Sequence, residues 1–257
     1  MSGQTNLVKL EKREGVAFIT LESPPLNILS AEMMNGIAEA LDDIAADADL
    51  LAVVFRSATK AFSAGADVGE HHPDKATAMI GAFGRMFTRL GELQLPVVMV
   101  VGGAALGAGF ELAMMGDIIL ASEKASFGQP EIRLGFFAPL AVAWLPRVVG
   151  PGRAAEITCT GRTYSAEQME RLGLVSRVVT PEELDSVLEA LLRDLRKASP
   201  LVMRMNMRLL KKLRRLPFEE AHREAEKVFL EELMATEDVL EGIASFYEKR
   251  RPAWKNR

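Results

Sequence analysis

The chain has 257 residues, of which 49% are hydrophobic and 26% are charged, and its formal net charge is −4. This length and balance suit one large globular domain, or a globular domain with a helical appendage. The small negative charge gives no general attraction to nucleic acid. No apolar run is long enough to span a membrane, and the polar first residues lack a signal-peptide pattern. We therefore expect a cytoplasmic protein that binds neither nucleic acid nor a membrane.

Cysteine and histidine are scarce in this chain. Cys159 is the only cysteine, so no intrachain disulfide forms and a reducing compartment is expected. We expect Cys159 to be a small core residue rather than a catalytic thiol. The three histidines include the adjacent pair His71 and His72, which we place in an exposed loop. So few candidate ligands predict no metal site.

Strands and helices are expected to alternate over the first half of the chain. Apolar, β-branched runs predict strands, and apolar residues at helical spacing predict the helices between them. This alternation predicts an α/β core whose strands are mostly buried. The expected elements are a strand at 16–21, a helix at 31–46 capped by Ser30, a strand at 51–56, a loop at 57–69, a helix at 76–93, a strand at 96–101, a helix from about Gly109 and a strand at 117–122.

The second half begins with short elements marked by capping boxes, in which a Ser or Thr side chain and a Glu or Gln three residues later satisfy each other's backbone donors. A glycine is the usual stop of such a helix. The expected elements are a helix from the Ser165–Gln168 box to Gly173, a strand at 174–179 and a helix from the Thr180–Glu183 box to about residue 198.

Residues 200–251 have a helical pattern almost throughout. We therefore expect a core at 1–199 and a C-terminal helical region at 200–257. A basic cluster opens this region on one side of an amphipathic helix. We expect a solvated face beside the acidic helices that follow, because nucleic-acid binding would need interleaved aromatic residues or a basic domain. The cluster comprises Arg204, Arg208, Lys211, Lys212, Arg214 and Arg215.

A glycine-rich turn at 102–109 joins the expected 96–101 strand to an apolar helix that carries Glu111. Glycine lets a ligand approach the main chain, and amides at a helix start have no intrahelical partner. The turn is therefore suited to a developing negative charge. A simple packing turn would explain the glycines, but it would not explain a carboxylate in so apolar a segment. The turn matches neither a P-loop nor a dinucleotide fingerprint.

Two further segments are expected to meet this turn. Segment 60–67 follows the 51–56 strand as the glycine turn follows the 96–101 strand, so both should emerge on one sheet edge. Two backbone amides could converge there on one oxygen. Segment 125–131 carries Glu131, a second carboxylate in an apolar region. Two carboxylates that face one pocket can add or remove water, because one deprotonates the water and the other protonates carbon.

These segments resemble the enoyl-CoA hydratase/isomerase family, also called the crotonase family. The resemblance covers nearly the whole chain, with the motifs in the family's order and spacing. It implies an α/β fold, a spiral of ββα turns followed by a helical trimerisation region. It also implies a hydratase that adds water to an α,β-unsaturated acyl-CoA thioester. The motifs are PPLN at 24–27, AFSAGAD at 61–67, ALGAGFELA at 105–113, FGQPE at 127–131, TGR at 160–162 and GLV at 173–175.

The resemblance assigns catalytic roles to particular residues. It implies that the backbone amides of Ala66 and Ala108 form an oxyanion hole for the thioester carbonyl, which stabilises an enolate. It also implies that Glu111 and Glu131 share the attacking water and transfer the protons. Coenzyme A is part of the substrate, so no separate cofactor is expected.

Two regions should hold the coenzyme A, if the resemblance is followed residue by residue. Phe246 and Lys249 match a C-terminal helix that reaches a coenzyme A bound mainly by a neighbouring subunit. The family therefore implies a homotrimer or a dimer of trimers. The loop that would hold the adenine and pantetheine contributes Lys60, Ala61, Phe62, Ala64, Asp67 and Val68.

The chain departs from simple hydratases after Glu131. Phe136, Phe137 and Pro139 stand where a glycine-rich loop is usual, so bulky apolar groups are expected around the acyl group. This run resembles the hydratases of cyclohexa-1,5-diene-1-carbonyl-CoA, enzymes of aromatic degradation, more than the short-chain crotonyl hydratases. Ala108 replaces a usual glycine but keeps its N–H, and Gly69 replaces a frequent lysine.

The sequence leaves other functions open. A double-bond isomerase needs only one carboxylate, whereas this chain has both. A thioester hydrolase or a carbon–carbon cleaving enzyme would also use glutamates that activate water. A non-catalytic family member that serves assembly or RNA contact would not need Glu111, Glu131 and two intact glycine turns together. The acyl group, the stereochemistry and the pathway are not fixed.

Overall fold

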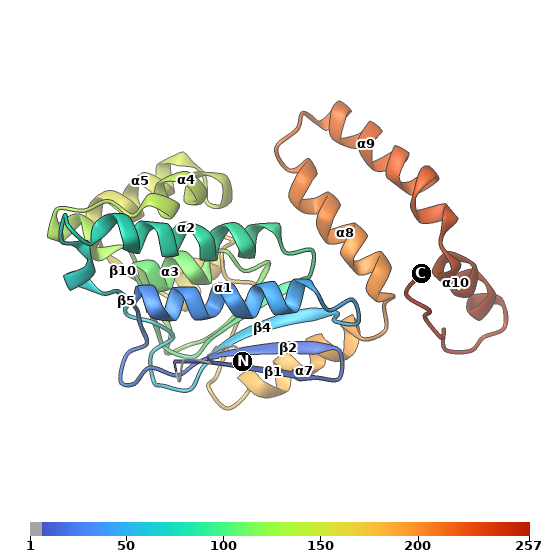
Figure 1. Ribbon diagram of the computed structural model, residues 1–257, viewed down its shortest axis with the longest axis horizontal. Coiled ribbons are helices and arrows are strands. Elements are labelled where there is room, and N and C mark those ends of the chain that lie inside the picture. The colour runs from blue at the N-terminus through green and yellow to red at the C-terminus, as the bar shows by residue number, and fades with distance from the viewer. Residues whose placement is uncertain (1–6) are drawn as a thin grey trace.

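A six-stranded sheet forms the centre of the protein, whose computed structural model describes residues 7–257 (Figure 1). The polar first residues, from which we expect no signal peptide, lie outside the described residues. The strand order is β1-β2-β4-β6-β8-β11, with β1 antiparallel to β2 and the other neighbours parallel. The strands are β1 (Val8–Arg13), β2 (Val16–Leu21), β4 (Ala52–Ser57), β6 (Val97–Val101), β8 (Ile118–Ser122) and β11 (Arg177–Val179).

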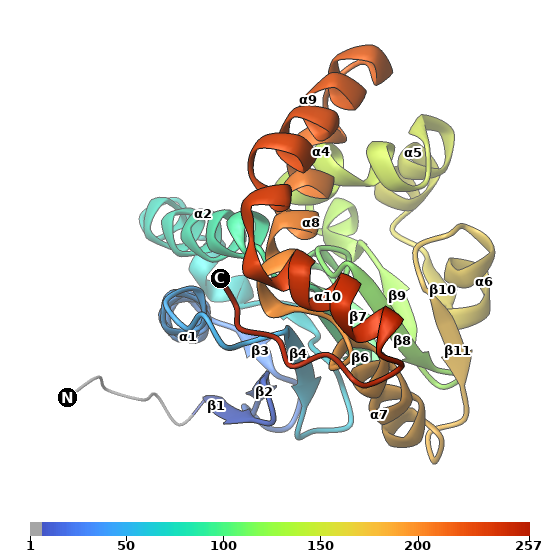
Figure 2. The ribbon, with the colours of Figure 1, turned by 90° about the vertical axis from the view of Figure 1, so that its right-hand side faces the viewer.

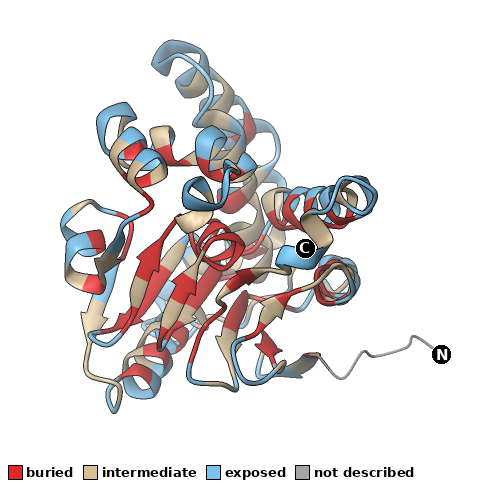
Figure 3. Ribbon diagram, turned by 90° about the vertical axis from the view of Figure 1, so that its left-hand side faces the viewer, coloured by how far each residue is buried: buried red, intermediate tan, exposed pale blue. Residues whose placement is uncertain are grey.

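Both faces of this sheet are covered, which explains why its central strands are continuous apolar runs. In β4, Val53 and Phe55 pack into a core shared with the helices α1 (Ala31–Ala45) and α2 (Ala76–Glu92). Val54 faces the other way, into a smaller core under α7 (Leu184–Leu195). Figure 3 shows that burial is concentrated in these strands. The predicted α/β core with buried strands is confirmed.

The chain repeats one unit, a long strand followed by a short strand and a helix, as the predicted spiral requires. The units are β2-β3-α1, β4-β5-α2, β6-β7-α3 and β8-β9-α4. The short strands pair apart from the large sheet, as β3 with β5 and as β10-β9-β7. The additional elements are β3 (Ile28–Leu29), β5 (Gly65–Ala66), β7 (Ala104–Leu106), β9 (Ser126–Gly128), β10 (Thr163–Ser165), α3 (Ala108–Ala113), α4 (Pro139–Val148), α5 (Pro151–Thr160) and α6 (Ala166–Arg171).

Two local predictions from the sequence are wrong. The Ser165–Gln168 capping box forms at the start of α6 as expected, but the Thr180–Glu183 box does not cap a helix. There the Thr180 hydroxyl donates to the Glu183 carboxylate at 2.9 Å, and α7 begins one residue later. Cys159 is exposed rather than a core residue, because it lies on the outer side of α5.

The C-terminal region consists of α8 (Pro200–Leu213), α9 (Phe218–Glu231) and α10 (Glu237–Tyr247), with the 3₁₀ turn η3 (Leu233–Ala235) before α10. Figures 1 and 2 show these helices extending beyond the sheet. Arg204 fixes α8 to the core by donating to the carbonyl oxygens of Asp47 and Leu50 at 2.6 and 3.0 Å. Among residues 7–257, no helix is long and apolar enough to cross a membrane.

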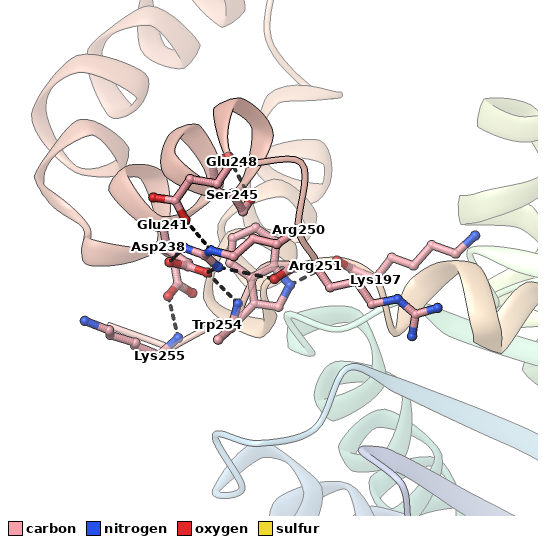
Figure 4. A network of polar contacts seen from close by, with 11 residues as sticks. Lys197, Asp238, Glu241, Ser245, Glu248, Arg250, Arg251, Trp254 and Lys255 are labelled. Carbon is pink, nitrogen blue, oxygen red and sulfur yellow. Dashed lines mark hydrogen bonds and ion pairs between the residues drawn. The ribbon is translucent and has the colours of Figure 1, made fainter.

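The last residues return along α10 and tie it to the core (Figure 4). The buried carboxylate of Asp238 accepts hydrogen bonds from the Ser199 hydroxyl at 2.5 Å and from the Lys255 amide at 2.7 Å. The Trp254 indole donates to the Lys197 carbonyl at 3.0 Å. These contacts hold α10 against the junction between α7 and α8.

Candidate active site

Two loops meet at one edge of the central sheet, as the sequence predicts. They follow β4 and β6, which are paired neighbours with Val53 opposite Val97. The loops are hydrogen-bonded to each other through Ser63, whose amide donates to the Ala104 carbonyl at 3.0 Å. The Ser63 carbonyl in turn accepts from the Leu106 amide at 2.9 Å. The two loops therefore form a single rigid surface of backbone groups.

Glycines make this close approach sterically feasible. A Cβ on Gly103 would lie 1.9 Å from the carbonyl oxygen of Lys60, and one on Gly109 would lie 2.3 Å from that of Ser63. Both obstacles are backbone atoms, which cannot rotate away as a side chain would. Any side chain at either position would therefore force the loops apart.

Two backbone amides and two glutamates line one cavity of about 90 Å³ at this surface. The amides belong to Ala66, in β5, and to Ala108, the first residue of α3. As the first helical residue, Ala108 has no intrahelical partner for its N–H. The glutamates are Glu111, in α3, and Glu131, in the 3₁₀ turn η2 (Pro130–Leu134). The structure thus brings together the four residues to which the family resemblance assigns catalytic roles.

Glu111 is buried, with 2% of its surface exposed. Burial, together with the charge of Glu131, raises its pKa to about 8, although a hydrogen bond from the Ala141 amide opposes the shift. That amide donates to Oε1 of Glu111 at 2.8 Å. Near neutral pH the carboxyl group of Glu111 therefore tends to carry a proton.

Glu131 approaches the glycine turn so closely that only glycine fits opposite it. A Cβ on Gly107 would lie 2.4 Å from Oε1 of Glu131, and Gly107 also has a positive φ of 55°. With its amide oriented to donate, Gln129 places its nitrogen 2.9 and 3.2 Å from the two carboxylate oxygens. Burial raises the pKa of Glu131, and the charge of His71 partly offsets this effect.

His71 is a functional-site residue that the sequence reasoning missed. The expected exposed loop is correct for His72 but wrong for His71, which ends the turn η1 (Val68–His71) and lines the cavity. Its Nδ1 bonds to the carbonyl of Asp67 at 2.8 Å, and its ring centroid lies 4.8 Å from that of Phe136. The signal available in the sequence was Asp67, four residues before His71, because an Asp can cap a short turn of the kind that directs His71 inward.

Some of the residues predicted to bind substrate line the cavity, and the others do not. Ala64, Val68, Phe136, Phe137 and Pro139 line the cavity together with the catalytic candidates. Phe137 stands at its mouth and is 67% exposed.

The rest of the predicted loop does not present side chains to this cavity. Phe62 is completely buried in the core, Ala61 is buried beside it, and Lys60 is exposed. The Asp67 carboxylate caps η1 by accepting from the Gly69 amide at 2.6 Å. Any contact of Ala61 or Phe62 with a ligand would therefore use the backbone.

Phe246 and Lys249 lie elsewhere in the chain. Phe246 is on α10 and Lys249 follows it, at the opposite end of the molecule from β5 and α3 (Figure 1). A single chain does not bring them to the cavity. Among the residues that the structure describes, no group of three His, Cys, Asp or Glu side chains is arranged to hold a metal ion.

The sequence model of the enoyl-CoA hydratase/isomerase family matches residues 11–257. The chain belongs to this family. A probable enoyl-CoA hydratase of Rhizobium meliloti is 38% identical over the full length of both chains. Cyclohexa-1,5-dienecarbonyl-CoA hydratase of Thauera aromatica is 32% identical over 97% of this chain and 96% of its own.

Solved structures agree with this assignment. An enoyl-CoA hydratase of Mycobacterium smegmatis superposes with a TM-score of 0.90 at 32% identity, over 96% of this chain and 98% of that one. The protein therefore has the crotonase fold that the sequence predicts. It is an enzyme of the enoyl-CoA hydratase type.

The buried carboxyl of Glu111 should make stability depend on pH. Its pKa is about 8 in the folded protein against an ordinary value of 4.5, so the folded state binds the proton more tightly. The contribution of this group to the free energy of unfolding is therefore fully present below about pH 4.5 and is lost as pH rises toward 8. Glu111→Gln removes the penalty, and we expect it to raise the free energy of unfolding by about 3 kcal/mol at the upper end of this range.

Urea unfolding of the two proteins across this pH range measures the effect. The advantage of Glu111→Gln should shrink toward acid pH. The control Glu123→Gln, at an exposed position, should follow the unmodified protein throughout. Parallel curves for Glu111→Gln and the unmodified protein would contradict the assignment of a protonated buried carboxyl.

Proposed function

We propose that the enzyme hydrates an α,β-unsaturated acyl-CoA thioester through an enolate held by the amides of Ala66 and Ala108. The observation that supports this most directly is that the two alanines, the buried Glu111 and the half-buried Glu131 line one small cavity. A thioester oxygen that accepts from the two amides would leave the acyl double bond beside the glutamates. Such donors commonly stabilise the developing charge by a few kcal/mol each, roughly 3–4 where one has been removed.

The two glutamates supply the proton balance that hydration needs. Water loses a proton as its oxygen bonds to one carbon, and the neighbouring carbon gains a proton. One carboxylate and one carboxylic acid therefore complete the addition without net uptake of protons. The raised pKa values of Glu111 and Glu131, and the charge that links them, favour a pair that shares one proton. Coenzyme A is part of the substrate, and the reaction needs no other cofactor.

The alternatives fit the site less well. An isomerase would need one carboxylate, yet the fold provides hydrogen-bond donors for two, the buried Glu111 and the half-buried Glu131. A hydrolase or a carbon–carbon cleaving enzyme would use the same groups on another atom, so product analysis distinguishes it. A non-catalytic subunit would gain no benefit from a carboxyl as buried as Glu111, because ionisation of that carboxyl destabilises the fold.

Removing either carboxyl should abolish most turnover. We expect Glu111→Gln and Glu131→Gln each to lower kcat by about 10²–10⁴-fold, with little change in the Kd of a saturated acyl-CoA. The unmodified enzyme should also lose kcat/KM as pH rises past about 8, where the pair loses its shared proton.

Steady-state kinetics across pH and calorimetry with a saturated ester measure both quantities. Gln129→Leu is an informative companion, since it removes the amide beside Glu131 while both carboxyls remain. It should shift the pH profile without abolishing turnover. Full activity in either glutamate variant would remove that residue from the mechanism.

We propose a cyclic dienoyl group as the acyl portion. The flat rings of Phe136 and His71 stand together at the cavity wall, and Phe137 stands at its mouth. Water would add at the far end of the conjugated system while the two amides hold the dienolate. The relative from Thauera aromatica, whose name specifies such a substrate, supports this choice.

A substrate comparison tests the cyclic group. Pocket shape discriminates by roughly 1–3 kcal/mol per misplaced methylene-sized group, so we expect kcat/KM for a cyclic dienoyl-CoA at least about tenfold above that for crotonyl-CoA. Products identified by mass separate hydration from isomerisation and hydrolysis. A preference for crotonyl-CoA would refute the cyclic acyl group and leave the hydratase proposal intact.

We also propose that the enzyme is a homotrimer or a dimer of trimers. Large apolar side chains on the C-terminal helices face solvent in the single chain, which is unusual for a stable monomer. Phe246 is 79% exposed, and from a neighbouring subunit it and Lys249 would reach the coenzyme A. The exposed side chains include Phe218, Phe229, Leu230, Leu240, Ile243, Phe246 and Tyr247.

Light scattering at micromolar concentration measures the assembly directly. The expected mass is three or six times that of the chain. Phe246→Asp should lower it, because a carboxylate in an apolar interface is strongly unfavourable. A mass equal to one chain for the unmodified protein would contradict the proposal.

A further inference from the structure

A second cavity, of about 730 Å³, lies among the helices α2, α4 and α8. Its walls next to the core are apolar and include Phe87, Met115, Leu140 and Trp144. Neither the motifs of the sequence nor the catalytic proposal accounts for it. The rest of its lining includes several cationic side chains of α4, of α8 and of the residues just after α8.

The second cavity adjoins the catalytic cavity. Ile80 and Phe83 of α2 and Pro139 of α4 line both. Ile80 is 45% exposed, so it does not seal one space from the other as a core residue would. The two cavities are therefore neighbours, and an acyl group that extended past the glutamates would run toward the second one, between α2 and α4.

Three exposed arginines also line this cavity: Arg147, near the end of α4, and Arg214 and Arg215, just after α8. The guanidinium of Arg214 lies 4.2 Å from the ring centre of Trp144, which fixes its position. Burial lowers the pKa of Arg214, and the charges of Arg215 and Arg147 lower it further, while Asp117 opposes the shift. The three cations are therefore close enough to repel one another.

These arginines differ from the other cations around the cavity. The predicted solvated basic face is confirmed for Arg208 and Lys212, which pair with glutamates of the C-terminal region. It is wrong for Lys211, whose side chain is only 13% exposed and pairs with Asp117, and for Arg204, which is bonded to the core. Within residues 7–257, none of the side chains of Arg147, Arg214 and Arg215 forms an ion pair with a carboxylate. Their mutual repulsion would be relieved by an anion that enters the cavity.

We propose that the second cavity binds the distal part of the acyl group and that the arginine cluster, Arg147, Arg214 and Arg215, selects acyl chains that end in a carboxylate. This inference rests on the proposed hydratase function and concerns acyl groups longer than the cyclic dienoyl group, which has no chain that reaches the cluster. Arg147 lies eight helical steps after Pro139, so the carboxylate would lie roughly 12 Å beyond the wall shared by the cavities. The apolar walls between these two points can pack against the carbon atoms of a ring or a chain, and the guanidinium groups can bind a carboxylate.

Paired substrates provide the test. Each pair contains two α,β-unsaturated acyl-CoA esters of equal chain length, one ending in methyl and the other in carboxylate. For chains long enough to reach the cluster, we expect kcat/KM about tenfold higher for the carboxylate ester, mainly through a lower KM. The advantage should be absent from short chains and should shrink at high salt, since the cluster is partly exposed.

Substitution of the cluster identifies its contribution. In Arg147→Gln combined with Arg215→Gln, the preference for the carboxylate ester should fall about tenfold, to near one. Arg214 is left in place because it packs on Trp144. Arg153→Gln, which breaks an exposed ion pair with Glu156 on α5, should keep the full preference. Equal kcat/KM for both members of every pair in the unmodified enzyme would overturn the proposal.

Calorimetry tests this inference independently of the hydratase proposal. The saturated counterparts of the paired esters bind without turnover, and the unmodified protein should bind the carboxylate member about tenfold more tightly. If no unsaturated ester is hydrated but this difference in Kd persists, the proposed reaction fails and the distal site stands. If short esters are hydrated but the Kd values are equal, the distal site fails and the reaction stands.

Discussion

The contact between two backbone loops at the edge of the central sheet is the constraint on which the site depends. The loop after β4 and the loop after β6 are hydrogen-bonded through Ser63, and Gly103 and Gly109 allow their main chains to touch. This contact places the amides of Ala66 and Ala108 around one cavity. A side chain at either glycine would separate the loops and widen the space between the amides. The position of the proposed oxyanion hole is therefore a consequence of backbone packing.

The second requirement of the site is a pair of carboxyl groups in surroundings that disfavour their charge. Glu111 is surrounded by apolar residues of α3, and its hydrogen bond from the start of α4 compensates only part of its burial. The carboxylate of Glu131 fits into the same space because Gly107 has no side chain. The fold is thus less stable near neutral pH than it would be with an uncharged residue at Glu111. Groups that share a proton near neutral pH are suited to moving protons between water and carbon.

The C-terminal helices combine two surfaces of different character. Their basic residues anchor α8 to the core or pair with α9, while large apolar side chains of α9 and α10 are left facing solvent. The chain end fixes α10 through Asp238 and Trp254, so these apolar groups are presented on a rigid support. Such a surface is suited to contact with another copy of the chain. The same region, through α8, closes one side of the cavity beyond the glutamates.

The sequence by itself determined the alternating α/β core, the principal helices, the helical C-terminus and the two loops with their glutamates, because periodicity, caps and glycine turns are local properties. Only the tertiary structure decided which of these groups meet. The strands β3, β5, β7, β9 and β10 are two or three residues long and carry no periodic signal, so their pairing could not be predicted. The inward position of His71 depends on packing against Phe136, and the exposure of Cys159 depends on which side of α5 faces the core. The arginine cluster joins a residue of α4 to residues that follow α8, far apart in sequence, so only the folded chain places these three guanidinium groups around one cavity.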